Sequence, residues 1–264
     1  MVFVIILVSA TVAGCSLRSG PARHVLEYTE RRQERKHGNC DSVGRGCVTV
    51  TLRDPVLSAP ASGPLRDSLE ACIRPFLYSN PQDGVTLSGI EALAESTSAQ
   101  YRDLTRRFPD YRIDWYLDRE VQVLTDSGGI VSLRCNQSLF LGGAHPLTTV
   151  TLMSFEASSG RRLGAGDMIE PGADQAFARV LESAFRKARN LPAAGDLKGE
   201  GFWVEPGKFP RSLNVGVRAD GLLFHYNPYE VAPYAMGPTE VFVPFSDLVG
   251  IVPAEGPLAE LAGR

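Results

Sequence analysis

The chain lacks the sequence signatures of the common nucleotide-binding and hydrolase sites. Its 264 residues contain no G-x-S-x-G elbow, no P-loop and no dinucleotide-binding fingerprint. There are only four histidines, and no two of them stand at a metal-ligand spacing such as H-x-H or H-x-x-x-H. The sequence therefore predicts neither a cofactor nor a metal ion.

A strong charge of one sign and a long apolar run are also missing. The 27 basic and 30 acidic residues give a formal net charge of −3, which does not indicate a nucleic-acid partner. The apolar run Met1–Gly14 is too short to cross a bilayer core of about 30 Å. We therefore expect residues 1–14 to be a cleaved signal peptide and not a transmembrane anchor.

The apolar run ends in two small residues followed by a cysteine, Ala13-Gly14-Cys15. With Val12 before it, this motif resembles the lipobox of bacterial lipoproteins, although no Lys or Arg precedes Cys15. The resemblance implies that Cys15 is lipidated and that the protein is held outside the cytoplasm on a bacterial membrane. In a cell with two membranes, Ser16 after the cysteine favours the outer membrane, facing the periplasm.

The segment that follows, residues 15–39, is polar and basic and is expected to be a solvated tether. An alternative is that its cluster of cations lies along anionic lipid headgroups. That cluster consists of Arg31, Arg32, Arg35 and Lys36.

Four cysteines remain after Cys15, an even number that suits disulfides in an oxidising compartment. Four cysteines allow three pairings. Cys40 and Cys47 bracket a short loop with two glycines, so a bridge between them closes the smallest loop. That pairing leaves Cys72 with Cys135, joining an expected helix to an expected strand.

Hydrophobic periodicity predicts an α+β fold with antiparallel sheets flanked by about three helices. Helical spacing covers residues 64–76, 88–108 and 177–188, whereas period-two alternation dominates 111–169 and 213–245. We expect two subdomains, an N-terminal α+β unit over residues 40–141 and a C-terminal unit over 142–250, followed by a tail over 251–264.

The candidate acid–base residues are His145 and His225, with Glu230 and Asp167 as possible carboxylate partners. Nothing in their spacing requires them to meet, and each histidine can instead be a structural residue bonded to a loop carbonyl. The sequence therefore favours a protein that is not an enzyme.

The segment from Phe224 to Pro238 is unusually rich in tyrosine and proline. Prolines stiffen a loop, and tyrosines offer a large amphipathic contact area at low entropic cost. The segment can be a contact surface or a rigid connection with its rings packed inward. The partner-binding candidates are His145, Tyr226, Tyr229, Glu230, Pro233 and Tyr234.

Two blocks of the sequence resemble a known family. The first runs from Gly142-Gly-Ala-His145 through Thr148-Thr-Val-Thr-Leu152 and Gly160-Arg-Arg-Leu163 to Asp167-Met-Ile169. The second holds Asn227-Pro-Tyr-Glu-Val-Ala-Pro-Tyr234, Gly237-Pro238 and Val243-Pro-Phe-Ser-Asp-Leu248. Both are similar to the domain of unknown function at the C-terminal end of the anti-sigma factor RsiV, which also occurs in the peptidoglycan deacetylase PdaC, and residues 47–135 resemble its partner domain more faintly.

The resemblance implies an envelope module of the kind that binds lysozyme in RsiV and accompanies a separate deacetylase domain in PdaC. Neither a sigma-binding segment nor a deacetylase domain is present here, so those activities do not carry over. We expect a lipid-anchored module that recognises a lysozyme-like muramidase or peptidoglycan, with no nucleic-acid partner. The alternatives are a peptidoglycan-modifying enzyme or accessory domain, and a purely structural lipoprotein.

Overall fold

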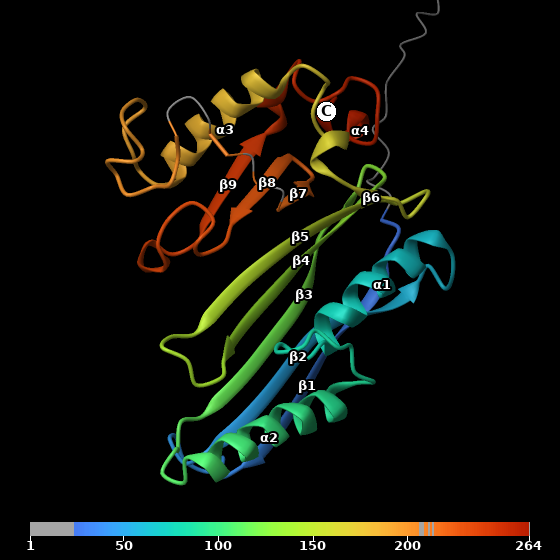
Figure 1. The fold of residues 1–264 in the computed structure, drawn as a ribbon. Coiled ribbons are helices and arrows are strands. Elements are labelled where there is room, and N and C mark those ends of the chain that lie inside the picture. Colours follow the sequence, from blue (N-terminus) through green and yellow to red (C-terminus); the bar gives the residue numbers. More distant parts are fainter. Residues whose placement is uncertain (1–23, 206–208, 211, 213, 264) are drawn as a thin grey trace, which may run out of the picture.

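The computed structural model describes residues 24–205, 209–210, 212 and 214–263. Its strands form a six-stranded sheet in the order β1-β2-β3-β4-β5-β6 and a three-stranded sheet in the order β7-β8-β9. As Figure 1 shows, α1 and α2 lie along the six-stranded sheet, and α3 lies alongside the three-stranded sheet. The predicted α+β class with three principal helices is confirmed.

The elements follow one another along the chain with these bounds: β1 Glu27–Gly38, β2 Cys47–Ala59, α1 Pro64–Tyr78, α2 Ile90–Arg107, β3 Trp115–Ser127, β4 Ile130–Phe140, β5 Leu147–Glu156, β6 Arg162–Leu163, α3 Asp174–Ala188, β7 Val215–Arg218, β8 Gly221–Tyr226, β9 Thr239–Pro244 and the short α4 Ala259–Ala262. Three 3-10 turns, η1 Ala165–Asp167, η2 Tyr234–Met236 and η3 Phe245–Leu248, complete the set.

The large sheet is antiparallel except for the neighbouring strands β2 and β3, which run parallel with Val48 opposite Trp115. Parallel neighbours need a long crossover, and here α1 and α2 supply it. The apolar stripe of α1, including Leu65, Leu69 and Leu77, packs in one core with sheet residues such as Val50 and Leu117.

The small sheet has its own core. Phe177, Leu181 and Phe185 of α3 pack with Phe224 and Tyr226 of β8 and with other apolar residues of β7 and β9. The expected tail over 251–264 contributes to this core, since Ile251, Val252, Leu258 and Leu261 are buried. All four side chains belong to the same hydrophobic cluster as α3 and the small sheet.

Residues 27–38 form strand β1 and are therefore not a solvated tether. They pair with β2 in an antiparallel ladder from Glu27 to Gly38. Two links hold the hairpin: the Cys40–Cys47 disulfide at its end and a bidentate ion pair of Arg31 with the buried Asp54 at 2.7 and 3.1 Å. The expected lipidated Cys15 and signal peptide 1–14 lie outside the described residues.

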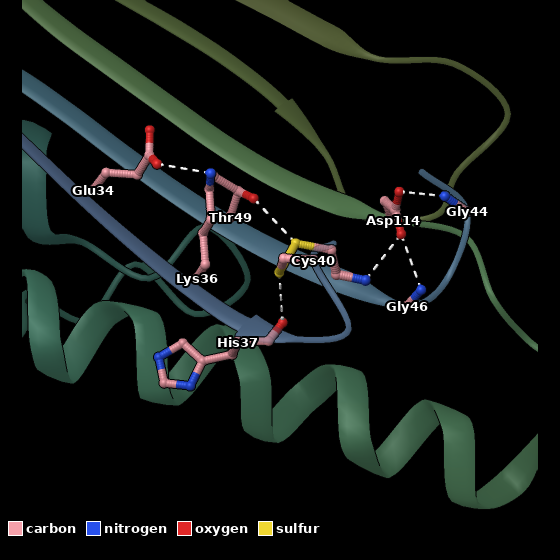
Figure 2. The surroundings of a disulfide bond; sticks show 9 residues. Glu34, Lys36, His37, Cys40, Gly44, Gly46, Thr49 and Asp114 are labelled. Atoms are coloured by element: carbon pink, nitrogen blue, oxygen red, sulfur yellow. Dashed lines mark hydrogen bonds and ion pairs between the residues drawn. A yellow bond between two sulfur atoms is a disulfide. The ribbon is translucent and has the colours of Figure 1, made fainter. Parts of the chain in front are cut away.

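A disulfide and the hydrogen bonds of one carboxylate fix the loop between β1 and β2 (Figure 2). The predicted Cys40–Cys47 bridge is present. Asp114 accepts backbone N–H bonds from Gly44, Gly46 and Cys47 at 2.6, 3.0 and 2.9 Å. Burial alone would raise the pKa of Asp114, but these amide donors outweigh it and hold the pKa below its usual value.

The second predicted bridge is not formed, because Cys72 and Cys135 are both free thiols. They belong to the same core, with Cys135 fully buried on β4 and Cys72 packed against that core from α1. Burial raises the pKa of Cys135 to about 12, so its thiol stays protonated. The cysteine prediction is thus correct for the loop and wrong for the long-range pair in this structure.

The expected boundary at 141/142 does not separate the two sheets. Strands β5 and β6 continue the large sheet through Leu163, and β5 pairs with β4 over ten positions from Ile130↔Glu156 to Leu139↔Leu147. The sheets change only between β6 and β7. No helix within the described ranges is long and apolar enough to cross a membrane.

Candidate binding site

Three aromatic residues from two distant loops come together at the junction of the sheets. His145 lies between β4 and β5, and Tyr229 and Tyr234 lie between β8 and β9. The His145 and Tyr234 rings stack with centroids 3.7 Å apart and planes at 23°. The Tyr229 ring is 5.8 Å from that of Tyr234. His145 and Tyr229 are exposed and Tyr234 is half-buried, so we name these three residues the aromatic surface.

Hydrogen bonds hold the aromatic surface in one orientation. The carbonyl of Pro146 accepts from Tyr234 Oη at 2.7 Å and from His145 Nδ1 at 2.9 Å. Because a carbonyl only accepts, Nδ1 carries the imidazole proton in this arrangement. His145 Nε2 then accepts the hydroxyl of Tyr229 at 3.3 Å, so each of the three rings has a polar anchor.

The loop that carries the two tyrosines is itself braced. Glu230 accepts the backbone N–H of Asn227 at 3.0 Å, and the Tyr229 N–H bonds the carbonyl of Ala232 at 3.2 Å. Tyr229 has φ 72°, a left-handed conformation that a bulky residue adopts only when its surroundings impose it. Pro233 precedes the 3-10 turn η2, which carries Tyr234.

Tyr226 is not part of the aromatic surface. It is 2% exposed within β8, and its hydroxyl donates to the carbonyl of Pro210 at 2.8 Å. Burial raises the pKa of this phenol well above its usual value. Of the six partner-binding candidates, Tyr226 therefore serves the core, while Pro233 and Glu230 shape the loop that presents Tyr229 and Tyr234.

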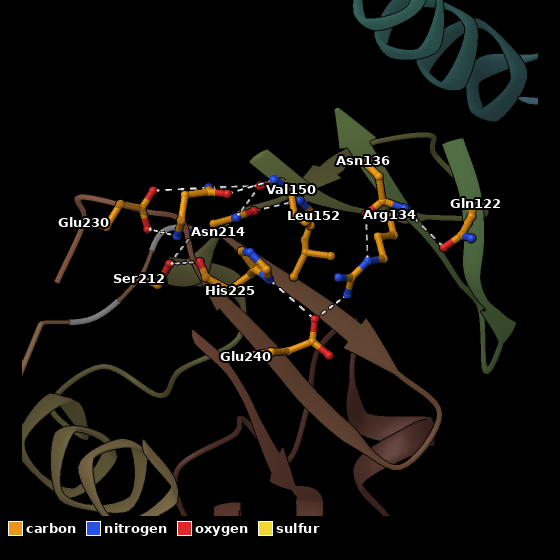
Figure 3. Close-up of polar contacts among 11 residues, drawn as sticks. Gln122, Arg134, Asn136, Val150, Leu152, Ser212, Asn214, His225, Glu230 and Glu240 are labelled. Atoms are coloured by element: carbon orange, nitrogen blue, oxygen red, sulfur yellow. Dashed lines mark hydrogen bonds and ion pairs between the residues drawn. The ribbon is translucent and has the colours of Figure 1, made fainter. Parts of the chain in front are cut away.

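A cavity of about 510 Å³ lies between the two sheets beside this loop, and Glu230, Asn227 and Asn214 are among its lining residues. Both asparagine side chains bind the free edge of β5, and Figure 3 shows Asn214 beside Val150 and Leu152. Asn227 Oδ1 accepts the N–H of Val150 at 2.8 Å, and Asn214 Oδ1 accepts that of Leu152 at 2.7 Å. Both Nδ2 groups donate to the carbonyl of Val150, at 2.8 Å from Asn214 and 3.0 Å from Asn227.

These two side chains replace a neighbouring strand at the edge of β5. A primary amide carries the same donor and acceptor groups as a peptide bond, so it can complete a strand edge without a backbone ladder. Neither asparagine could be recognised from the sequence as a contact to β5, because an asparagine in a loop is typical of turns and its distant backbone partner leaves no local signal.

His225 lies away from the aromatic surface, in a separate polar network. It is 5% exposed, and its Nδ1 is 3.4 Å from Glu240 Oε2, a carboxylate that also pairs with Arg134 of β4. Burial lowers the pKa of His225, although the bond to Glu240 acts in the opposite direction. Burial on its own would raise the pKa of Glu240, but Arg134 outweighs it and the pKa lies below its usual value.

The four acid–base candidates do not contact one another. Asp167 accepts the N–H of Gly164 at 2.8 Å and pairs with Arg161, and these bonds lower its pKa, the amide bond most. His225 bonds Glu240, Glu230 bonds Asn227, and His145 bonds Tyr229 and Pro146. Across the part of the chain that the structure describes, no three His, Cys, Asp or Glu residues cluster in a way that could hold a metal ion.

Comparison with known proteins finds solved structures of DUF3298 family members with a similar fold. No curated protein has significant sequence similarity to it. A crystal structure of a DUF3298 family member from Bacteroides fragilis has a TM-score of 0.71 and 19% sequence identity, over 92% of this chain and 100% of that chain. A DUF3298 family protein from Pseudomonas aeruginosa has a TM-score of 0.59 and 20% identity, over 86% of this chain and 95% of that chain.

These likenesses concern the fold, and the small sheet also matches at the level of sequence. Residues 166–246, which include α3 and β7 to β9, match the family model described as a protein of unknown function (DUF3298). The chain thus has the fold of solved DUF3298 family proteins and carries a DUF3298 match over residues 166–246.

Proposed function

We propose that this protein is a lipid-anchored binding module of the bacterial cell envelope and that it recognises a lysozyme-like muramidase through the aromatic surface. The observation that carries the proposal is the arrangement of His145, Tyr229 and Tyr234, three rings that hydrogen bonds orient, with the two tyrosines presented from a braced loop. Tyrosine is enriched among residues that dominate binding energy, and an ordered ring loses little conformational entropy on association.

Two further observations support a binding role. The acid–base candidates are engaged in separate contacts, which fits recognition better than acid–base chemistry. The aromatic surface also spans a loop of the large sheet and a loop of the small sheet, so a partner seated there contacts both.

The binding test compares variants that differ in location. Tyr229→Ala and Tyr234→Ala are each expected to weaken lysozyme binding by about 2 kcal/mol, which is about 30-fold in Kd. Tyr28→Ala is the matched control, since Tyr28 is also exposed (39%) but lies on β1 of the large sheet. Isothermal titration calorimetry with purified lysozyme gives the affinities, and thermal melting reports the fold of each variant.

Four outcomes would contradict the proposal. A wild-type protein that binds no muramidase refutes the partner. Equal losses for Tyr229→Ala and Tyr28→Ala refute the site. Retention of purified muropeptides with no retention of lysozyme favours a glycan partner, and turnover of those muropeptides that is lost in His145→Ala with His225→Ala favours an enzyme.

The anchor has its own test. Lipidation of Cys15 is expected to place the protein in the membrane fraction and to label it with a palmitate analogue. A Cys15→Ser variant is expected to lose both properties. Persistence of both in the variant would contradict the anchor while leaving the binding proposal open to its separate measurement.

A further inference from the structure

The free edge of β9 borders a groove beside α3. A cavity of about 720 Å³ lies between α3 and β9, and in Figure 1 the helix runs alongside this strand. Arg189 of the α3 C-cap donates to the carbonyl of Met236 at 3.1 Å, which fixes the end of the helix beside the start of the strand. The groove is therefore elongated along β9.

The backbone groups on this side of β9 have no strand partner among the described residues. β9 pairs only with β8, with Val241 opposite Phe224 and Val243 opposite Leu222. Phe245 N donates towards β8, to the carbonyl of Asp220 at 3.0 Å. Because amides alternate along a strand, the N–H groups of Glu240 and Phe242 point the other way, into the groove.

Pro244 ends this open edge. A proline has no N–H to donate, so an added strand can pair beside Glu240 and Phe242 and gains no further donor at Pro244. All three of these residues line the groove. The edge thus offers two donors and the intervening carbonyls to a short extended segment.

The helix side of the groove carries two rows of residues at four-residue spacing. The inner row is small and apolar, Val180, Ala184 and Ala188. The outer row has a cation at each end and is formed by Arg179, Ser183 and Lys187. Arg179 and Lys187 are exposed, and neither forms an ion pair with a described residue.

The spacing of the two cations matches an extended peptide. Eight residues of α-helix span about 12 Å, and four residues of a β-strand span about 13 Å. Peptide positions i and i+4 point to the same face of a strand. An acidic residue at each of those positions would therefore meet Arg179 and Lys187 together, with small side chains over the inner row.

We propose that the α3–β9 groove binds an extended segment of a partner protein as a fourth strand of the small sheet, with acidic residues at positions i and i+4. A second copy of this chain fits the groove poorly, because pairing two β9 edges would bring the Arg179 and Lys187 rows of both copies together. This site is separate from the aromatic surface, so it stands or falls independently of the proposed function.

The test uses synthetic peptides and isotope-labelled full-length protein. The probe is acetyl-Thr-Glu-Val-Ser-Val-Glu-Thr-amide, which carries glutamates four residues apart. One control peptide replaces both glutamates with lysine, a second places them three residues apart, and two more carry backbone N-methyl groups on one edge or the other. NMR titration follows the amides of Glu240 and Phe242.

The probe is expected to shift and protect these two amides, and N-methylation of only one peptide edge is expected to abolish binding. The lysine peptide and the peptide with its glutamates three residues apart should bind at least fivefold more weakly than the probe. Arg179→Gln and Lys187→Gln should each weaken binding of the probe by about threefold. The double reversal Arg179→Glu with Lys187→Glu should instead prefer the lysine peptide, while Tyr229→Ala should leave peptide affinity unchanged.

The proposal is overturned if the glutamate and lysine peptides bind equally, or if both N-methylated peptides bind as tightly as the probe. It is also overturned if the Glu240 and Phe242 amides do not respond at millimolar peptide. Concentration-dependent protection of these amides without peptide, together with dimers in sedimentation, would assign the edge to a second copy instead.

Discussion

Asn214 and Asn227 allow a quantitative test of how the two sheets are joined. Each side chain accepts one backbone N–H of β5, from Leu152 and Val150 respectively, and both donate to the carbonyl of Val150. Replacing either asparagine with leucine keeps a side chain of similar size and removes the amide. A single substitution therefore leaves one N–H without its partner, while the Val150 carbonyl keeps one donor.

The expected cost follows from this difference. An orphaned buried polar group costs about 1–3 kcal/mol. Val150 and Leu152 line an open cavity, so water can reach the orphaned groups and the cost should fall in the lower half of that range. We expect about 1–2 kcal/mol for each single variant. The double variant also removes the last donor to Val150 and should lose about 1 kcal/mol more than the sum.

Urea denaturation of the wild type, both single variants and the double variant measures this coupling directly. Asn136→Leu is the control, because the side chain of Asn136 bonds other side chains of the large sheet, including Glu120, and not the edge of β5. Hydrogen exchange at the amides of Val150 and Leu152 should accelerate in the matching variants. Additive losses, or a double variant no less stable than the singles, would refute the account of a shared acceptor.

Three further predictions concern other parts of the fold. Asp114→Asn should lower the free energy of unfolding by about 1 kcal/mol in chemical denaturation, because one amide oxygen replaces a carboxylate that accepts three N–H bonds; an unchanged value would contradict this. Gly142→Ala should cost about 2–4 kcal/mol, because φ is 82° and the added Cβ would lie 1.9 Å from Tyr111 Oη, whereas Gly143→Ala, with its nearest contact at 4.0 Å, should cost under about 1 kcal/mol. The lowered pKa of His225 means that the unfolded chain binds more protons below about pH 6.5, so stability should decline with acid there, and His225→Gln should flatten that part of the pH profile of thermal melting.

The helices and the tyrosine-rich loop could be anticipated from the sequence because their signals are local. The α2 prediction over 88–108 agrees closely with Ile90–Arg107, since an apolar residue recurs at every third or fourth position. Helix α1 continues past Pro75 to Tyr78: the proline removes one helical hydrogen bond, and Leu77 in the last turn is buried in the core. The density of tyrosine and proline after residue 224 indicated either a contact surface or a rigid connection. Of its three tyrosines, Tyr229 is exposed, Tyr234 is half-buried and Tyr226 is buried.

Strand β1 was not predicted, because it is an edge strand whose side chains are largely exposed on both faces. Its residues are mostly polar or charged and carry no apolar period, so the segment has the composition of a tether. Pairing with β2 and the ion pair of Arg31 with Asp54 order it, and both depend on residues about twenty positions away. Composition was enough to name His145 and Tyr229 as candidates, but their contact could not be foreseen, because 84 residues separate them.

The hydrogen bonds of Asn214 and Asn227 to the backbone of β5 also decide which fragments of this chain can fold on their own. The family match begins at residue 166, after β6, and therefore does not include β5. A fragment that begins at residue 166 would keep both asparagines and lose the backbone groups of Val150 and Leu152 to which they are hydrogen-bonded. It would also expose Leu223 and Phe242, which pack with Val150 and Leu152 of β5. An exposed apolar patch beside amide side chains that lack hydrogen-bond partners favours aggregation. A soluble fragment that contains the small sheet must therefore include β5.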